Sequence, residues 1–461
     1  MSSATSALLA ALESELAPGG VLSGDAAGAR YHSDSTRMNA CAPLAVLRPA
    51  STAEVAAILT RCHAARQPVV VQGGLTGLAG GATPRQGEIA LSLERLTGVE
   101  AIDADAGTAR VRAGTPLAAI HDAVAPHGLQ FALDLGARGS CNIGGNIATN
   151  AGGNRVIRYG MTRELVLGLE AVLADGTVLS SLNAMLKNNA GYDLKQLFIG
   201  TEGTLGVVTR AVLRLHPAPR ERLTALVAVP SFADLVAVLR RTRMDLGGQL
   251  GSFETMWSDY YEFSLRHGPV GPRPFPQQYP YYALIELEAL DPQVDRERFE
   301  ALLAALLEAG IAADAVLAQS LEESARLWRI RESAGELMRH LQPVTAYDIS
   351  LPIAAMPDYL AEITRRCAPL LGEWPLFLFG HLGDGNLHIV ASVKTLAGLR
   401  ALDAEIYGAL AGIGSVAAEH GIGVLKRAYL GNSRSATELA MMRHLKAGLD
   451  PHGILNPGRV L

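Results

Sequence analysis

Residues 131–153 read FALDLGARGSCNIGGNIATNAGG, and this glycine-rich run constrains the fold more than any other segment. Six of its residues are glycine, and most of the others are small or carry an amide. A packed core has little use for such a run, because glycine buries no side chain and loses the most conformational entropy on folding. Backbone N–H groups in such loops can instead approach a large anion closely. Similar loops stand at residues 71–84 and 199–206, and the three together predict a cofactor that contains a pyrophosphate.

Length and charge narrow the class of protein. A chain of 461 residues is long enough for two or three domains. The 40 basic and 45 acidic residues form no long run of either sign, which argues against a nucleic-acid partner. The apolar stretches are interrupted before the roughly 20 residues that a membrane-spanning helix needs, so we expect no transmembrane segment.

The N-terminus and the cysteines indicate the compartment. The first residues lack a basic region and include acidic residues within their apolar periodicity, so they predict an amphipathic helix rather than a signal peptide. The four cysteines have no C-x-x-C spacing, which indicates neither an iron–sulfur cluster nor a disulfide framework. A reducing, cytoplasmic location is therefore expected.

The pattern of strands and helices changes along the chain. Strand-like runs at 44–47 and 69–71 flank a helical pattern from about 51 to 66, where Ser51 and Glu54 predict a capping box. This β-α-β opening resembles a Rossmann unit, but the glycine spacing after the second strand fails and Pro84 stands where a helix should continue. Strands dominate up to residue 215. Strands and helices then alternate, with helices expected at 231–246 and 295–309 and a strand at 281–288. We therefore place a domain boundary near residue 220 and predict an N-terminal helical segment at residues 1–37.

A second informative segment is Phe379-Gly-His-Leu-Gly-Asp-Gly-Asn-Leu-His388. His381 and His388 flank a Gly-Asp-Gly-Asn turn, so their side chains can converge, and Glu419 and His420 follow in another glycine-rich stretch. Two imidazoles and one carboxylate with an open position form a ligand set of catalytic divalent metals. His420 is then available as a general base. Histidines beside a turn are also common on protein surfaces, so the metal interpretation depends on the glycine-rich context.

Two further residues have an ordinary and a functional interpretation. Arg331 lies on a helical pattern and is a solvated charge unless that helix faces a ligand cavity, where a guanidinium can grip a carboxylate. Cys141 lies in the glycine-rich run and has two interpretations, a covalent bond to the cofactor or a small buried thiol, of which the buried thiol is favoured.

The motifs together resemble a known family, the FAD-linked oxidases of the vanillyl-alcohol oxidase superfamily. The nearest likeness is to its branch of D-2-hydroxyglutarate dehydrogenase, FAD-linked D-lactate dehydrogenase and the flavin subunit of glycolate oxidase. The resemblance covers about residues 43–461, and the motifs that carry it are 134–146, 189–206, 381–388, Glu419-His-Gly421, Asp450-Pro and Asn456-Pro-Gly458.

The resemblance implies an α+β fold with a two-part FAD-binding domain (38–218) and an α/β cap domain (219–410). The C-terminal segment (411–461) is expected to return to the flavin. Because Gly73 and Gly74 offer no group for a covalent bond, the FAD is expected to be non-covalent. The implied cofactor-binding residues are Gln72, Gly73, Gly74, Leu75, Thr76, Gly77, Leu78, Asp134, Leu135, Gly136, Gly139, Ser140, Gly144, Gly145, Asn146, Thr149, Asn150, Gly152, Gly153, Glu202, Gly203, Gly206, Val207, Val208 and Asn456.

The resemblance also implies a reaction, the oxidation of a D-2-hydroxy acid to the 2-oxo acid. His381, His388 and Glu419 match the family's ligands for zinc, or alternatively manganese. The implied catalytic residues are His420 as the base, Arg331 as the carboxylate-binding group, and Asn386. An electron-transfer flavoprotein, a quinone or a cytochrome, rather than NAD, is expected to accept the electrons, and a homodimer is one compatible state.

Two departures from the family pattern put the usual dicarboxylate substrate in doubt. Ala346 stands where a lysine is frequent, and Gly335 stands where a hydroxyl residue is frequent. Because Ala346 and Gly335 are small and leave space, we expect the substrate to be a larger or more apolar 2-hydroxy acid. The alternatives are an oxygen-using oxidase, a non-catalytic flavin-binding subunit of a larger oxidase, and a metallohydrolase that would leave the glycine loops unexplained.

Overall fold

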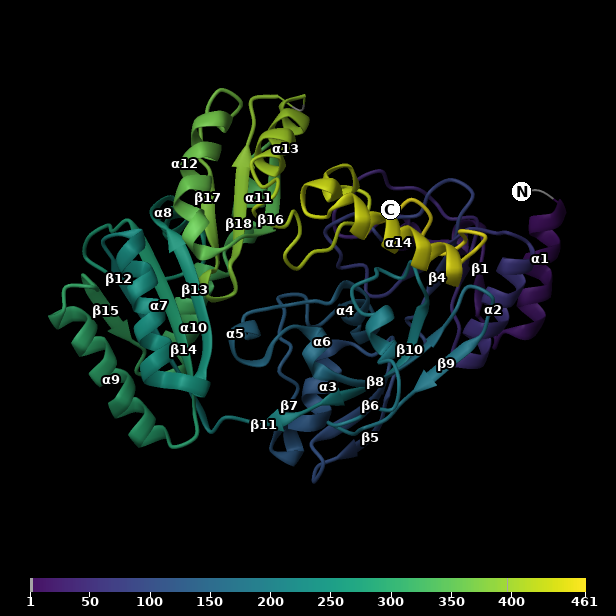
Figure 1. Cartoon of the computed structure of the whole chain (residues 1–461), viewed down its shortest axis with the longest axis horizontal. Helices are drawn as coiled ribbons and strands as arrows, with labels where there is room; N and C mark the ends of the chain where they lie inside the picture. Colours follow the sequence, from purple (N-terminus) through teal and green to yellow (C-terminus); the bar gives the residue numbers. More distant parts are fainter. Residues whose placement is uncertain (1–2, 396) are drawn as a thin grey trace. The chain divides into compact units, whose positions relative to one another are not determined.

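The computed structural model describes residues 3–395 and 397–461, which form two compact units (Figure 1). The first unit contains Met1–Gly153, Tyr159–Ala218 and Glu419–Leu461, and the second contains Asn154–Arg158 and Pro219–Ala418. In the part of the chain that is described, no helix combines the length and the apolar character needed to cross a membrane.

The first unit is built on two sheets that share one hydrophobic core. The smaller sheet has the order β1-β2-β4-β3, in which β2 and β3 both run parallel to β4. The larger sheet is antiparallel, with the order β5-β6-β10-β8-β9. The strands are β1 (Val21–Leu22), β2 (Val46–Leu47), β3 (Val69–Gln72), β4 (Ile89–Ser92), β5 (Val99–Asp103), β6 (Thr108–Arg112), β8 (Val166–Val172), β9 (Val178–Ser181) and β10 (Val207–Arg214), with a separate pair β7 (Leu129–Gln130) and β11 (His216–Pro217). The helices are α1 (Ser3–Glu15), α2 (Thr52–Ala64), α3 (Leu117–Val124), α4 (Ile143–Thr149), α6 (Thr162–Leu165) and α14 (Ala436–Leu449).

Helix α2 begins where the sequence predicts. The Ser51 side chain accepts a hydrogen bond from the Glu54 N–H, as an N-cap should. The predicted capping box is only half correct, because the Glu54 carboxylate accepts from the Ala50 N–H at 2.9 Å rather than from Ser51. After β3 the chain enters irregular turns up to β4, so the rejection of a Rossmann helix at this point is confirmed.

The C-terminal segment belongs to the first unit and runs beside β3. The Val69 N–H donates to the Ile454 carbonyl at 2.8 Å, and the Asn456 N–H donates to the Val69 carbonyl at 2.9 Å. Lys446 in α14 donates to the carbonyls of Thr204 and Leu455, both at 2.8 Å. The bonds of Val69 attach the tail to the strand that leads into the first glycine loop, and the bond to Thr204 attaches it to the loop 199–206.

The second unit contains a seven-stranded antiparallel sheet of order β15-β12-β14-β13-β17-β18-β16. Helices α7 and α9 lie against β14, while α8 and α10 pack on the face that presents Met256, Leu284 and Phe379 (Figure 1). Its strands are β12 (Glu221–Val229), β13 (Leu250–Trp257), β14 (Tyr281–Ala289), β15 (Asp314–Leu317), β16 (Val344–Ser350), β17 (Phe377–His381) and β18 (Asn386–Ser392). Its helices are α7 (Phe232–Leu246), α8 (Ser258–His267), α9 (Pro292–Glu308), α10 (Leu321–Arg331), α11 (Ala334–His340), α12 (Met356–Cys367) and α13 (Gly398–Gly408), and α5 (Val156–Tyr159) begins in its short segment.

Candidate functional site

A cavity of about 750 Å³ in the first unit lies where two of the predicted glycine loops meet. Gly73, Gly74, Leu75 and Ser140, all predicted as cofactor residues, line it. This volume is typical of a site for a large organic ligand. Asn142 of the second glycine loop also lines the cavity, although it was not among the predicted cofactor residues. The other lining residues were missed because they lie outside the glycine loops: Ala29, Arg30, Ser33, Asp34, Arg37, Ala40, Glu94, Thr97, Gly114 and Pro116.

Gly74 brings the two glycine loops into direct backbone contact. A Cβ atom at this position would overlap the Ser140 carbonyl oxygen and would lie 2.6 Å from Asn142 Oδ1. Only glycine therefore fits here, and the cavity has a wall of exposed backbone that suits a phosphate-bearing cofactor.

Replacing Gly74 by alanine is expected to destabilise the first unit by about 1–3 kcal/mol and to weaken FAD binding, because the loops must separate to admit the methyl group. The ratio of flavin to protein after gel filtration and the thermal unfolding midpoint would measure both effects. Gly448→Ala is the matched control, since a Cβ at Gly448 meets open space in α14. Retention of FAD and of stability by Gly74→Ala would contradict this role of the loop contact.

Several other predicted cofactor residues have evident packing roles. A Cβ at Gly144 would lie 2.7 Å from Ala113 Cβ, and one at Gly153 would overlap the Asp134 carbonyl. A Cβ at Gly206 would lie 2.8 Å from the Phe198 ring. Close packing within the chain thus suffices to require glycine at these three positions. Their contact with FAD stays a prediction.

Glu202 and Asn456 join segments of the first unit. The Glu202 carboxylate accepts from the N–H groups of Ile422 and Gly423 at 2.7 and 2.8 Å, and Asn456 Oδ1 accepts from the Val71 N–H at 2.8 Å. Glu202 thus holds the C-terminal segment at the glycine loop 199–206, and Asn456 holds it at the start of the first loop. The remaining predicted residues lie at the end of β3 and in the loop after it (Gln72, Thr76, Gly77, Leu78), in the turn before α4 (Asp134, Leu135, Gly136, Gly139), in and after α4 (Gly145, Asn146, Thr149, Asn150, Gly152) and before or in β10 (Gly203, Val207, Val208).

Cys141 is buried in the core of the first unit. Burial raises the pKa of its thiol, which disfavours the reactive thiolate. This agrees with the interpretation of Cys141 as a packing residue.

In the second unit, the β17–β18 hairpin brings His381 and His388 together. Phe379 pairs with His388 across the two strands, and Phe379 and His381 point to the same face because side chains alternate along a strand. Both imidazoles therefore project from one face, with ring centroids 5.4 Å apart. The Gly-Asp-Gly turn that the sequence singled out is the 3₁₀ turn (Leu382–Asp384) and Gly385 between the strands.

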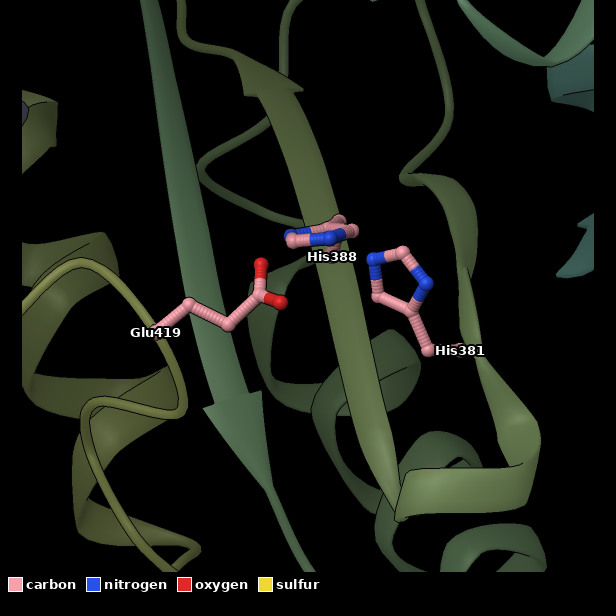
Figure 2. A group of neighbouring side chains, drawn as sticks. All are labelled: His381, His388 and Glu419. Carbon is pink, nitrogen blue, oxygen red and sulfur yellow. The ribbon is translucent and has the colours of Figure 1, made fainter. Parts of the chain in front are cut away.

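Glu419 directly follows Ala418, the last residue of the second unit, whose N–H donates to the Asp348 carbonyl at 3.4 Å. The ligand-type atoms of His381, His388 and Glu419 lie within 4.8 Å of one another. Figure 2 shows the Glu419 carboxylate directed toward the two imidazoles. The donor set fits a divalent metal such as zinc, which takes nitrogen and carboxylate ligands at this spacing.

Asp348 is a site residue that sequence reasoning missed. It lies on β16 directly opposite His388, is 1% exposed, and has an oxygen 3.8 Å from His388 Nδ1. Asp348, Glu419 and His420 form a second group whose ligand-type atoms lie within 4.8 Å of one another. Asn386, predicted to be catalytic, donates from Nδ2 to Asp348 Oδ1 at 2.8 Å. The available signal was an aspartate within an otherwise uncharged strand pattern, at 344–350.

Arg331 is buried rather than solvated, with 7% of its surface exposed at the end of α10. Its Nε donates to Glu254 Oε2 at 2.8 Å, and its Cζ lies 4.8 Å from the centre of the Phe379 ring. Glu254 Oε1 lies 2.7 Å from His381 Nδ1. Glu254 was not among the predicted site residues, although a glutamate in the apolar run LGSFETMW was a usable signal.

Glu254 is fully buried, and burial by itself raises the pKa of a carboxyl group. The interactions of the carboxylate with His381 and Arg331 outweigh this effect, so the pKa of Glu254 is lower than usual. Glu254 is therefore a carboxylate, and it connects a predicted metal ligand with the predicted carboxylate-binding arginine.

Two family models match the chain. The model described as FAD binding domain matches residues 43–181, and the model described as FAD linked oxidases, C-terminal domain, matches residues 218–460. Together with the glycine-lined cavity, these matches define a two-domain FAD-binding oxidoreductase. The chain belongs to the FAD-linked oxidase family.

Relatives and solved structures agree with this assignment. The chain is 42% identical to a D-2-hydroxyglutarate dehydrogenase of Xanthomonas citri pv. viticola, over 93% of this chain and 92% of the relative. It is 41% identical to the mitochondrial D-2-hydroxyglutarate dehydrogenase of Bos taurus, over 90% of this chain and 76% of the relative. A structure of p-cresol methylhydroxylase superposes with a TM-score of 0.79 at 16% identity, covering 100% of this chain and 97% of that one, which confirms the fold. The predicted family and fold class are thus correct.

Proposed function

We propose that this chain oxidises a D-2-hydroxy acid to the corresponding 2-oxo acid, with a zinc or manganese ion held by His381, His388 and Glu419. The observation that carries the proposal is the convergence of these three side chains beside a buried arginine, in a chain of the FAD-linked oxidase family. The relatives named as D-2-hydroxyglutarate dehydrogenases support the D-2-hydroxy acid class.

Arg331, His420 and Asp348 have distinct roles in the proposed reaction. Arg331 binds the substrate carboxylate, because its guanidinium has five N–H donors and the contacts with Glu254 use Nε and Nη2. His420 accepts the proton of the 2-hydroxyl group, and Asp348 lies close enough to orient it. The metal, when bound, supplies Lewis-acid polarisation of the hydroxyl and carboxylate oxygens.

FAD, when bound, accepts the two electrons of the oxidation. We propose that an electron-transfer flavoprotein, a quinone or a cytochrome then takes these electrons from the protein, with oxygen as the alternative acceptor. The role of the first unit is to bind FAD through its glycine-lined cavity.

The substrate range follows from two small residues. Ala346 is exposed and lies on the same face of β16 as Asp348, since the two are separated by one residue. A Cβ at Gly335 would meet open space. A second substrate carboxylate finds no cation at Ala346, so we propose a preference for D-2-hydroxy acids with an apolar side chain. D-2-Hydroxyglutarate, the substrate in the names of the relatives, is the second candidate.

Anaerobic bleaching of the flavin absorbance tests this function. D-2-Hydroxy acids are expected to reduce the flavin while their L-enantiomers do not, and aromatic or branched D-acids are expected to react faster than D-2-hydroxyglutarate. Equal rates for apolar and dicarboxylate substrates would contradict the proposed preference. A flavin that no 2-hydroxy acid bleaches would contradict the function and favour the non-catalytic subunit.

A further inference from the structure

We infer that Glu254 is a positioning residue that prepares His381 for metal binding and holds Arg331 in place with the same carboxylate. This inference rests on the metal-assisted function proposed above and assigns a part of it to a residue of β13. Its evidence lies within the second unit.

The strand register places Glu254 beside His381. Strands β13 and β17 pair Thr255 with Gly380 and Met256 with Phe379, and the same register continued by one residue sets Glu254 opposite His381. Directly opposite residues on neighbouring strands have close Cβ atoms and face the same side. The contact between Glu254 Oε1 and His381 Nδ1, at 2.7 Å, is thus built into the sheet.

The contact selects the useful tautomer of His381. A carboxylate oxygen accepts but cannot donate, so the proton of the neutral imidazole lies on Nδ1 and the lone pair on Nε2. A neutral imidazole whose second nitrogen donates to a carboxylate is a better and better-oriented metal ligand. Arg331 Nη2 lies 3.5 Å from His381 Nε2, which agrees with an acceptor at that atom.

The second carboxylate oxygen of Glu254, Oε2, holds Arg331 in place. Oε2 lies 2.8 Å from both Nε and Nη2 of Arg331. Glu254 is fully buried, so these two partners take the place of water around its charge. Loss of the carboxylate would therefore loosen the metal ligand and the arginine together.

Zinc affinity, measured by competition with a chromogenic chelator on the FAD-loaded protein, tests the inference without relying on turnover. Glu254→Gln is expected to raise the zinc Kd by about 10–100-fold, as is typical when the hydrogen-bond partner of a metal-ligating histidine is lost. Glu254→Asp keeps the negative charge but moves it away from His381 and Arg331, because the side chain is one methylene shorter. Its zinc Kd is expected to lie between those of the wild type and Glu254→Gln. This second variant also tests the inference if Glu254→Gln does not fold.

Glu288→Gln is the matched control. Glu288 is equally buried on the neighbouring strand β14, but it pairs with Arg158 at 2.9 Å rather than with a predicted metal ligand. Its replacement is expected to lower the unfolding midpoint and to leave the zinc Kd unchanged.

The possible results distinguish failure of the role of Glu254 from failure of the proposed metal-assisted function. A wild-type zinc Kd retained by Glu254→Gln, with His381→Ala defective, would overturn the role of Glu254 while leaving the metal site intact. A similar loss of affinity in Glu288→Gln would also overturn it, because the effect would then be general destabilisation of the sheet. Wild-type protein that binds neither zinc nor manganese would overturn the metal site and, with it, the role of Glu254.

Discussion

Replacing His420 by alanine is expected to lower the rate of substrate oxidation by about 10²–10⁴-fold while FAD stays bound. His420 is the group to which we assign the 2-hydroxyl proton, and it lies in a group with Asp348 and Glu419 within 4.8 Å. Without a base, the hydroxyl must release its proton to water, which is a poor acceptor at neutral pH. The FAD cavity is lined by other residues, so the substitution removes none of its walls.

The rate of anaerobic flavin reduction, followed by stopped flow at saturating substrate, measures this effect apart from reoxidation. The flavin-to-protein ratio shows whether the cofactor is retained. His444→Ala is a suitable control, because His444 is an exposed histidine on α14 and has no proposed part in the reaction. An unchanged reduction rate in His420→Ala would remove His420 from the role of base.

Removal of the metal by a strong chelator is expected to lower turnover by more than about a hundredfold, since Lewis-acid stabilisation of a transition state is worth several kcal/mol. His381, His388 and Glu419 offer two neutral nitrogen donors and one carboxylate, a set that binds zinc or manganese reversibly. Turnover should return when either ion is added back to the dialysed protein.

The flavin spectrum is the internal control of the chelation experiment. The chelator should leave flavin absorbance in place, and His388→Ala should show the same loss of turnover before any chelator is added. Full activity after complete removal of divalent metal, verified by elemental analysis, would refute the metal-assisted mechanism and leave Arg331 and His420 as the remaining groups for substrate binding.

Much of the local structure was predictable because it depends on neighbouring residues. The N-cap of α2 requires only Ser51 followed by an exposed N–H at Glu54. The β17–β18 hairpin requires a Gly-Asp-Gly turn between two apolar runs, and that turn length decides that His381 and His388 face the same side. The composition of the glycine loops by itself likewise predicted a cofactor that contains a pyrophosphate.

The sequence by itself therefore determined the family, the glycine loops and the pair of histidines, since each depends on residue types at short spacing. Only the tertiary structure decided that Arg331 is buried and that Glu254 and Asp348 flank the histidines. Glu254 and His381 are 127 residues apart in sequence, and their contact depends on the register between β13 and β17. Strand register across such a distance is set by the packing of the whole sheet face, which no local pattern encodes.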